Sequence, residues 1–184
     1  MQKLSGQNSL KPVYLPVSAF TKTSSMFSFR FFRKRIKYTR PSIEHVSLVE
    51  RRAEEFRRFY EERFRYGLNY EKNSLHLLDV ILSEARDSSL SQDRKQWLAL
   101  HAGAYLFKVA SQRFPDWPMQ YLWYHPLEQL MMVIGPPTYR ISLLAHQAVL
   151  LRLDALPDLP ISMLFHRFEK AVLSAKAGDD QLFM

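Results

Sequence analysis

One stretch near the middle of the chain, residues 97–110, is apolar on almost every side when it is read as a helix. It reads WLALHAGAYLFKVA. A helix of this kind is buried on most sides, because a helix exposed to water carries a polar stripe. We predict a helix over about 92–114 and expect other elements to surround it. Gly103 lies in its middle, where glycine costs about 1 kcal/mol relative to alanine, so another element should approach closely there.

Four further helices are predicted from apolar residues that recur at spacings of three and four. Ser42 precedes the first of them and is a typical N-cap residue, whose side-chain oxygen accepts a hydrogen bond from the first turn. Asn73 or Ser74 is expected to cap the second. The four predicted segments are residues 43–66, 74 to about 87, 139–153 and 161 to about 178.

Only two segments favour β-strands, and prolines interrupt the helical pattern around both. Residues 119–124 read MQYLWY and residues 127–134 read LEQLMMVI, and short runs of this composition are typical of strands. We therefore predict an α+β fold, mostly helical, with about five helices and a short antiparallel β-ribbon. The expected domain comprises residues 41–178, between a disordered basic tail (1–40) and a loose C-terminus (179–184).

Positive charge is concentrated at the N-terminal end of the chain. Residues 1–40 contain nine of the 26 lysines and arginines and no acid. Residues 41–184 contain the other 17 basic residues and all 18 acidic residues, which is a formal charge of −1. A domain that binds nucleic acid through its own surface would itself carry an excess of basic over acidic residues. Any contact with a polyanion is therefore expected to depend on the tail.

The stretch FSFRFFRKRIKYTR, residues 27–40, interleaves aromatic and basic side chains. Four interpretations stay open. The stretch contacts nucleic acid through phosphates and bases, binds an anionic membrane surface, belongs to a targeting segment, or is a solvated tail whose aromatic rings pack on the domain. The residues expected to bind a polyanion are Arg30, Arg33, Lys34, Arg35, Lys37 and Arg40.

Composition excludes or disfavours several kinds of site. The chain has no cysteine, which excludes disulfides, zinc thiolate sites and cysteine nucleophiles. Its six histidines include no pair at the i,i+3 or i,i+4 spacing of a metal motif,. Its five glycines form no phosphate-binding loop,. We therefore predict no metal, no nucleotide and no other cofactor.

Asp79 is the most unusual acid of the chain, because it shares the apolar face of Leu75 and Leu82 in a predicted helix. A carboxylate in that position must be paired or hydrogen-bonded. It is either an acid or base with a shifted pKa near a cleft, or a structural tie to a helix end, a tyrosine or a histidine. We favour the structural interpretation.

His101 and Tyr105 lie one turn apart on the central predicted helix. Together with Asp79 they would supply the carboxylate, imidazole and phenol of general acid–base catalysis, and the same groups would equally suit a satisfied interior network. No nucleophile motif accompanies them, so we predict no enzyme. Asp79, His101 and Tyr105 are the catalytic candidates of the enzyme alternative, which requires Asp79 and His101 to line one open pocket.

Three aromatic residues near the predicted strands are the candidates for contact with a partner. They are Trp117, which precedes the predicted strand 119–124, and Trp123 and Tyr124, which end that strand and begin the segment WYHP. Exposed tryptophan and tyrosine side chains are common anchors of protein interfaces. The alternative is that they seal the end of the small sheet against the helices.

Residues 74–168 resemble a small bacterial domain family of unknown function. The matching segments are SLHLLDVIL (74–82), for the family pattern SLxxLDxxL, and GAYLFKV (103–109), for GAYLxxV. The family's tryptophan-containing β element would correspond to Trp117 or Trp123. The resemblance implies an α+β fold and framework roles for Asp79 and Gly103, and it brings no activity.

These observations lead us to expect a non-catalytic protein-interaction or regulatory domain of the immunity or adaptor kind, in the bacterial cytoplasm. A protein partner would bind at the aromatic β edge or at the charged face of the predicted helix 43–66. The first alternative is a peripheral membrane- or nucleic-acid-associated protein that acts through residues 27–40. The second is a small enzyme that uses Asp79 and His101.

Overall fold

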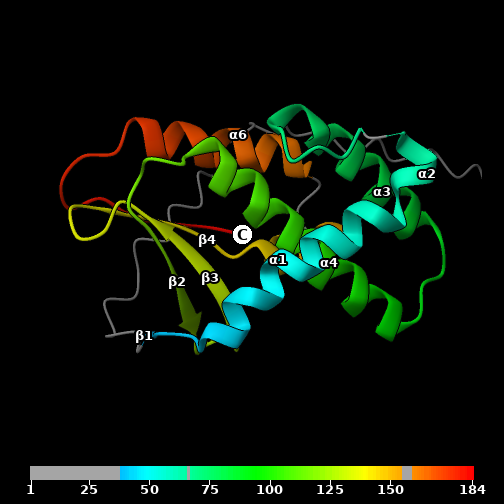
Figure 1. The fold of residues 1–184 in the computed structure, drawn as a ribbon, viewed down its shortest axis with the longest axis horizontal. Coiled ribbons are helices and arrows are strands. Elements are labelled where there is room, and N and C mark those ends of the chain that lie inside the picture. The colour runs from blue at the N-terminus through cyan, green and yellow to red at the C-terminus, as the bar shows by residue number, and fades with distance from the viewer. Residues whose placement is uncertain (1–37, 66, 155–158) are drawn as a thin grey trace, which may run out of the picture. The chain divides into compact units, whose positions relative to one another are not determined.

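The computed structural model describes residues 38–65, 67–154 and 159–184, and these form helices and one sheet (Figure 1). The α+β, mostly helical fold class is confirmed. In chain order the elements are β1 (Tyr38–Thr39), α1 (Ile43–Phe59), α2 (Glu61–Phe64), the 3-10 helix η1 (Lys72–Ser74), α3 (Leu75–Asp87), α4 (Gln92–Arg113), β2 (Met119–Tyr124), β3 (Gln129–Ile134), β4 (Arg140–Leu143), α5 (Ala145–Leu153), α6 (Ile161–Leu173) and β5 (Asp180–Phe183).

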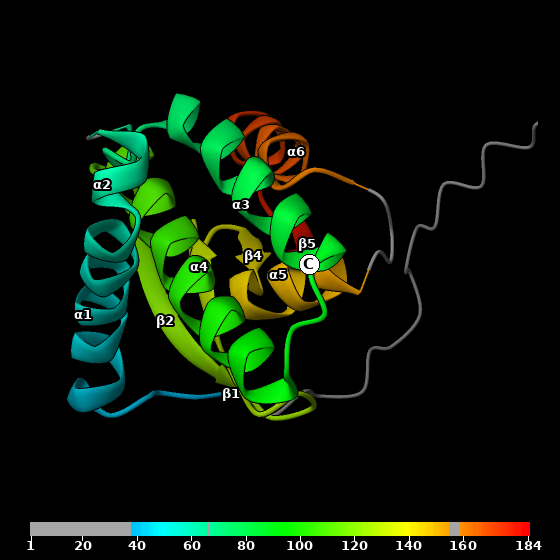
Figure 2. The ribbon, with the colours of Figure 1, turned by 90° about the vertical axis from the view of Figure 1, so that its right-hand side faces the viewer.

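The central helix is α4, which contacts α1 on one side and α5 on another (Figure 2). Its apolar middle is buried, as predicted. Gly103 is where α5 approaches: a Cβ on Gly103 would lie 2.9 Å from the backbone nitrogen of His146 and 3.0 Å from its Cα. The expected close approach is therefore confirmed, and it explains why the helix carries a glycine there.

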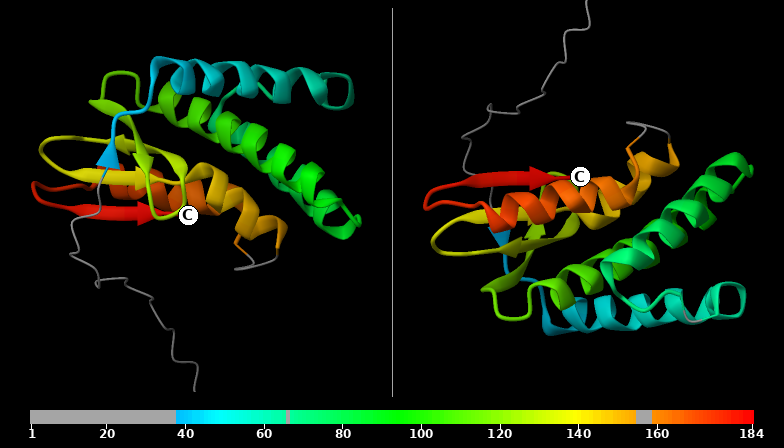
Figure 3. Two further views of the ribbon diagram at one scale, coloured as in Figure 1. Left: turned by 90° about the horizontal axis from the view of Figure 1, so that it is seen from below. Right: turned by 90° about the horizontal axis from the view of Figure 1, so that it is seen from above.

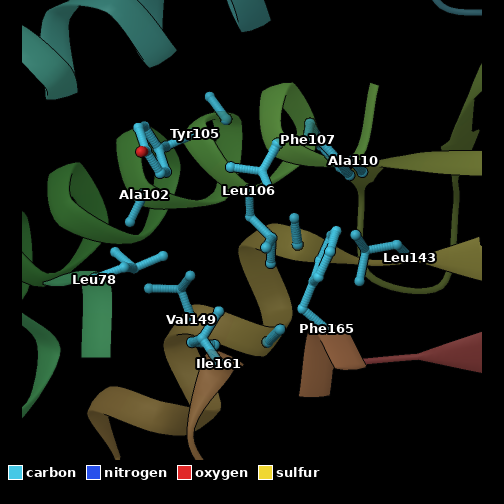
Figure 4. Close-up of a cluster of buried hydrophobic side chains, with 14 of the residues drawn as sticks. Leu78, Ala102, Tyr105, Leu106, Phe107, Ala110, Leu143, Val149, Ile161 and Phe165 are labelled. Atoms are coloured by element: carbon cyan, nitrogen blue, oxygen red, sulfur yellow. The ribbon is translucent and has the colours of Figure 1, made fainter. Parts of the chain in front are cut away.

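The main hydrophobic core lies where α4 meets α3, α5, α6 and β4. Figure 4 shows side chains from all these elements converging on one cluster. Burial of each Leu, Ile, Val or Phe side chain in this cluster contributes about 1.5–3 kcal/mol relative to exposure. Labelled members of the cluster are Leu78, Ala102, Tyr105, Leu106, Phe107, Ala110, Leu143, Val149, Ile161 and Phe165.

The sheet has five strands in the order β1-β2-β3-β4-β5. The first four pair antiparallel, whereas β5 pairs parallel to β4. The prediction of a short antiparallel ribbon was therefore wrong in strand number and direction, although its central hairpin, β2 with β3, is present. A parallel partner needs a crossover connection, and here α5 and α6 lie in the chain between β4 and β5 (Figure 3).

Strand β4 occupies the start of a segment that was predicted to be helical. Ile141 and Leu144 fit a helical spacing with Ala145 and Ala148, but residues 141–143 pair with β3 instead. Helix α5 begins only at Ala145. A four-residue segment carries too little periodicity to distinguish strand from helix, and the pairing with β3 decides its structure.

The predicted helix over 43–66 is broken at Tyr60, where φ is −102° and ψ is 2°. Helix α1 ends at Phe59 and the short α2 follows. This break raises the number of α-helices in the described ranges from the predicted five to six. The predicted N-cap is confirmed, because the Ser42 hydroxyl oxygen accepts a hydrogen bond from the backbone nitrogen of His45.

Both predicted ends of the domain need correction. Residues 179–184 were expected to be loose, but Asp180–Phe183 form β5 beside β4. Tyr38 and Thr39 were placed in the disordered tail, but they form β1 and pair with Tyr124 and Trp123. The rest of the predicted tail, residues 1–37, lies outside the described residues. No helix in the described ranges combines the length and the apolar character that crossing a membrane requires.

Candidate functional site

Asp79 binds the start of helix α6. Its Oδ1 accepts a hydrogen bond from the backbone nitrogen of Ile161 at 2.6 Å, and its Oδ2 accepts one from Ser162 at 3.2 Å. The residue at the N-cap position of α6 is Pro160, which makes no side-chain cap hydrogen bond. The first backbone N–H groups of a helix lack partners within the helix, and a carboxylate from α3 satisfies them here. This is the structural tie that the favoured interpretation of Asp79 describes.

His101 joins α4 to α1. Its Nδ1 hydrogen-bonds the carbonyl oxygen of Trp97 at 2.7 Å, and its Nε2 lies 3.0 Å from a carboxylate oxygen of Glu55 on α1. The indole of Trp97 stacks on the imidazole with 4.1 Å between ring centroids. Both ring nitrogens of His101 are thus engaged within the domain.

Tyr105 is fully buried and ties α4 to the segment before α3. Its hydroxyl oxygen accepts a hydrogen bond from the backbone nitrogen of Tyr70 at 3.1 Å and lies 2.5 Å from the hydroxyl of Ser74. Burial raises the pKa of its phenol above the usual value. The hydroxyl has a structural role that accounts for its burial.

The three catalytic candidates therefore do not meet. Asp79 holds α6, His101 holds α1 and Tyr105 holds the turn near Ser74. Two cavities lie within the described residues, one beside Phe59 and one beside Arg52, and none of the three candidates lines either of them. The enzyme alternative requires Asp79 and His101 to line one open pocket, and neither of these two cavities is lined by both residues.

The three aromatic candidates are half-buried and lie in different surroundings. Trp117 packs edge-on against Phe114, with ring centroids 5.8 Å apart. Trp123 lies 5.4 Å from the ring of His45 on α1, and Tyr124 lies 6.2 Å from the ring of Tyr38 on β1.

These aromatic residues do not form one patch. Trp117 lies two residues before β2, whereas Trp123 lies near the far end of that strand. Trp123 and Tyr124 are neighbours in the strand and so point to opposite faces of the sheet. The three residues therefore do not lie on one common surface.

The larger of the two cavities is an apolar groove between α1, α3 and α4, with a volume of about 630 Å³. We call it the Phe59 groove. Phe59, at the end of α1, is 67% exposed, and its ring lies 5.2 Å from that of Trp97, which is 37% exposed. Ile81 and Leu90 are among the other lining residues. Two large aromatic rings thus remain exposed above an apolar floor.

Charged residues border the Phe59 groove. Arg63 and Glu84 form an ion pair across it, from α2 to α3. Arg94 lines the groove from α4. Within the described residues, the Arg94 guanidinium has no hydrogen bond or ion pair. Arg63 and Glu84 neutralise each other, so the border of the groove carries a net positive charge from Arg94.

Sequence reasoning missed Phe59 and Trp97 as exposed residues. The apolar stripe of the first predicted helix comprises Val46, Val49, Ala53, Phe56 and Tyr60, of which Val49, Ala53 and Phe56 are buried and the other two half-buried. Phe59 was not assigned to this stripe. It is the last residue of α1, and it is 67% exposed.

The second cavity, which we call the Arg52 cavity, lies at the opposite end of α1. Its lining comes from α1, α4, the β2–β3 hairpin and the first turn of α5. Trp123 is the one predicted site residue that lines it, beside His45 and His146. Its volume is about 310 Å³.

The predicted polyanion-binding residues lie almost entirely outside the described structure. Arg40 is described and its side chain is exposed between β1 and α1. The remaining residues of the set are Arg30, Arg33, Lys34, Arg35 and Lys37, all of which fall in the range that the structure does not describe. Their role stays a prediction.

Comparisons with family models, with curated proteins and with solved structures gave no match. The resemblance to a bacterial domain family stays a prediction that rests on its two short segments. Within the described ranges, no three His, Asp or Glu side chains are grouped to hold a metal ion.

Proposed function

We propose that this chain is a non-catalytic protein-interaction domain, of the immunity or adaptor kind and cytoplasmic in a bacterium, that binds a partner in the Phe59 groove. The observation that carries the proposal is the exposure of Phe59 and Trp97 above an apolar floor. Aromatic residues that stay exposed beside a groove are the typical anchors of an interface. The structural duties of Asp79, His101 and Tyr105 support a non-catalytic role.

The shape of the groove suits the apolar face of an amphipathic helix. Such helices bind in grooves between helices and insert apolar side chains at positions i, i+3, i+4 and i+7. The walls here are α1, α3 and α4. Because the Arg94 guanidinium has no partner within the described residues, a complementary ligand would carry an acidic residue beside its apolar face.

The test is selection of binders from a displayed library of amphipathic helical peptides whose polar positions vary in charge. The full chain serves as bait. Selected peptides should carry an apolar i,i+4 face and an acid, and they should bind the Phe59→Glu variant at least about tenfold more weakly, because the substitution places a charge in an apolar contact.

Ile43→Glu is the matched control for this test. Ile43 is another large apolar residue of α1, 86% exposed, at the opposite end of the helix. Both substitutions add the same charge to the same helix, so peptides bound in the Phe59 groove should retain affinity for Ile43→Glu. Equal loss with both variants, or selected peptides without an acid, would refute this mode of binding.

A second proposal concerns the basic tail and rests on charge segregation. The residues from 41 onward carry a formal charge of −1, so the excess of +8 on the chain arises from residues 1–40. We propose, as the alternative function, attachment to an anionic membrane surface or nucleic acid through residues 27–40. Each basic residue near anionic lipid contributes about 1 kcal/mol.

Binding of the full chain to vesicles with and without phosphatidylserine, across a salt series, tests the tail proposal. The variant replaces Arg30, Arg33, Lys34, Arg35 and Lys37 with glutamine. Binding should require anionic lipid, weaken with salt and disappear in the variant. A parallel titration with single-stranded nucleic acid distinguishes the two polyanions. Absence of binding to both at low salt would exclude this role.

A further inference from the structure

The Arg52 cavity has the features of a small-molecule site, and it is separate from the Phe59 groove. Its walls are mostly apolar, with Leu48 on α1, Leu100 and Phe107 on α4, and Trp123 and Leu130 on the hairpin. Its volume of about 310 Å³ is at the small end of ligand sites, which are mainly apolar with a few convergent polar groups. A ligand of this size would have one ring or a short branched chain.

Arg52 brings a positive charge to this cavity without a counterion. Its side chain is half-buried and lines the cavity. Neighbouring arginines of α1 are paired: Arg51 with Glu55, and Arg57 with Glu54. Arg52, by contrast, has no hydrogen bond or ion pair to any described residue. A partly buried charge without a partner is costly, so the cavity favours an anion.

Two buried polar atoms in residues that line the cavity also lack partners. Within the described structure, Nε2 of His146 and Oε1 of Gln129 are buried and make no hydrogen bond. The amide nitrogen of Gln129 does donate, to Gln147 at 3.2 Å. Buried polar atoms of native proteins nearly always have a partner, so Nε2 of His146 marks a place where a polar ligand would be held. Oε1 of Gln129 can only accept a hydrogen bond and does not bind an anion.

The position of His146 is set rigidly by the fold. It lies in the first turn of α5, and its backbone rests against Gly103 of α4. Burial, together with the positive charge of Arg52, lowers the pKa of the His146 imidazole. Arg52 therefore acts electrostatically on this imidazole, and a neutral ring can donate from Nε2.

We propose that the Arg52 cavity binds a small monocarboxylate with an apolar, ring-shaped or branched body. The carboxylate accepts hydrogen bonds from the guanidinium of Arg52, which suits the planar geometry of that pair, and from Nε2 of His146. The apolar body packs between Leu100 and Leu130. Glu128 also lines the cavity but is exposed, which places its charge at the entrance.

Calorimetric titration of the full chain with benzoate, benzamide and inorganic phosphate at equal ionic strength tests the proposal. Benzamide has the ring of benzoate without its charge, and phosphate has the charge without a ring. Benzoate should bind at least about tenfold more tightly than either, as expected for one charge-assisted hydrogen-bonded pair combined with apolar burial.

Three variants assign the binding to the cavity. Arg52→Gln should reduce the preference for benzoate over benzamide to near one, whereas Arg51→Gln, a control at an adjacent position with a 68% exposed side chain, should leave it unchanged. Leu48→Trp fills the cavity and should abolish binding of both ring compounds. Thermal unfolding of each variant verifies that it is folded.

Four outcomes would overturn the proposal. They are absence of benzoate binding at millimolar concentration, equal binding of benzamide, equal binding of phosphate, and retention of benzoate binding by a folded Leu48→Trp protein. The first would mean that the unpartnered atoms of His146 and Gln129 are met by water. The second and third would mean that the charge or the ring is not recognised.

Discussion

Asp79 stabilises a helix to which it does not belong. It lies on α3, and its carboxylate accepts hydrogen bonds from the first turn of α6, whose own cap position holds a proline. The arrangement joins two helices that are distant in the chain. Asp79 therefore lies on an apolar helix face because the first backbone N–H groups of α6 need a hydrogen-bond acceptor there.

Replacing Asp79 with alanine should lower the free energy of unfolding by about 1–2 kcal/mol, the usual cost of losing a helix cap. Urea denaturation of both proteins measures the change. Asp116→Ala, which removes an exposed acid, is the control and should change stability by less than about 0.5 kcal/mol. A neutral effect of Asp79→Ala would mean that water replaces the cap without loss.

Glu169 is a second buried acid with a structural partnership. Its residue is 5% exposed on α6, and its carboxylate binds Lys72 before α3 and Arg113 at the end of α4. Burial raises the pKa of Glu169, but hydrogen bonds from Lys72 and Arg113 outweigh burial and hold the pKa of this carboxyl below its usual value. The folded state therefore favours the charged form.

The stability that Glu169 contributes should depend on pH. Because its folded-state pKa lies below its unfolded value, the contribution is complete above about pH 4.5 and disappears as the pH falls through the folded-state pKa. Glu169→Gln should cost about 1–3 kcal/mol at pH 7 and progressively less as acid is added. Urea denaturation across this pH range measures the difference, and a pH-independent difference would contradict it.

At the scale of elements, the close contact between α4 and α5 depends on a glycine, Gly103, which has no side chain. Gly103 allows the backbone of α5 to lie against α4. The same contact fixes His146, which lines the Arg52 cavity. Packing of two helices and the shape of a cavity therefore depend on the same position.

Gly103→Ala should destabilise the domain although alanine is the better helix former by about 1 kcal/mol. The added Cβ would meet backbone atoms at 2.9–3.2 Å, and overpacking of this kind costs about 1–3 kcal/mol. Thermal unfolding tests this. Gln112→Ala, at an exposed position of the same helix, controls for helix propensity and should be neutral or stabilising. A more stable Gly103→Ala protein would show that α5 shifts freely.

At the scale of the whole described domain, the C-terminal strand completes the sheet. Asp179 and Phe183 accept backbone hydrogen bonds from Arg140 and Leu144, both at 2.8 Å. The ring of Phe183 lies 5.7 Å from that of Phe168 on α6. Strand β5 thus joins the sheet to the helical layer.

Removing residues 179–184 should lower the free energy of unfolding by about 2–4 kcal/mol, since the backbone pairing of β5 with β4 and the aromatic contact of Phe183 are lost,. Urea denaturation measures it. Removal of Met184 alone is the control and should have little effect, because that residue follows the strand and is 43% exposed. An unchanged stability after the longer deletion would mean that β5 contributes nothing to the fold.

Much of the helical architecture follows from local pattern. The all-round apolar stretch at 97–110 identified the central helix, Gly103 indicated the close approach, and Ser42 indicated the first N-cap. These inferences hold because helical hydrogen bonds and helix caps lie within a few residues of one another. The sequence by itself therefore determined the fold class and the place of α4.

Other features were decided only by tertiary structure. Strand β4 needed β3 as a neighbour, β5 needed β4, and Phe59 at the end of α1 stayed exposed. Asp79 was recognisable as an acid in need of a partner, but its partner lies 82 residues away. Strand pairing, cavities and long-range caps depend on which distant segments meet, and that is settled by burial of the whole core, which no local spacing encodes.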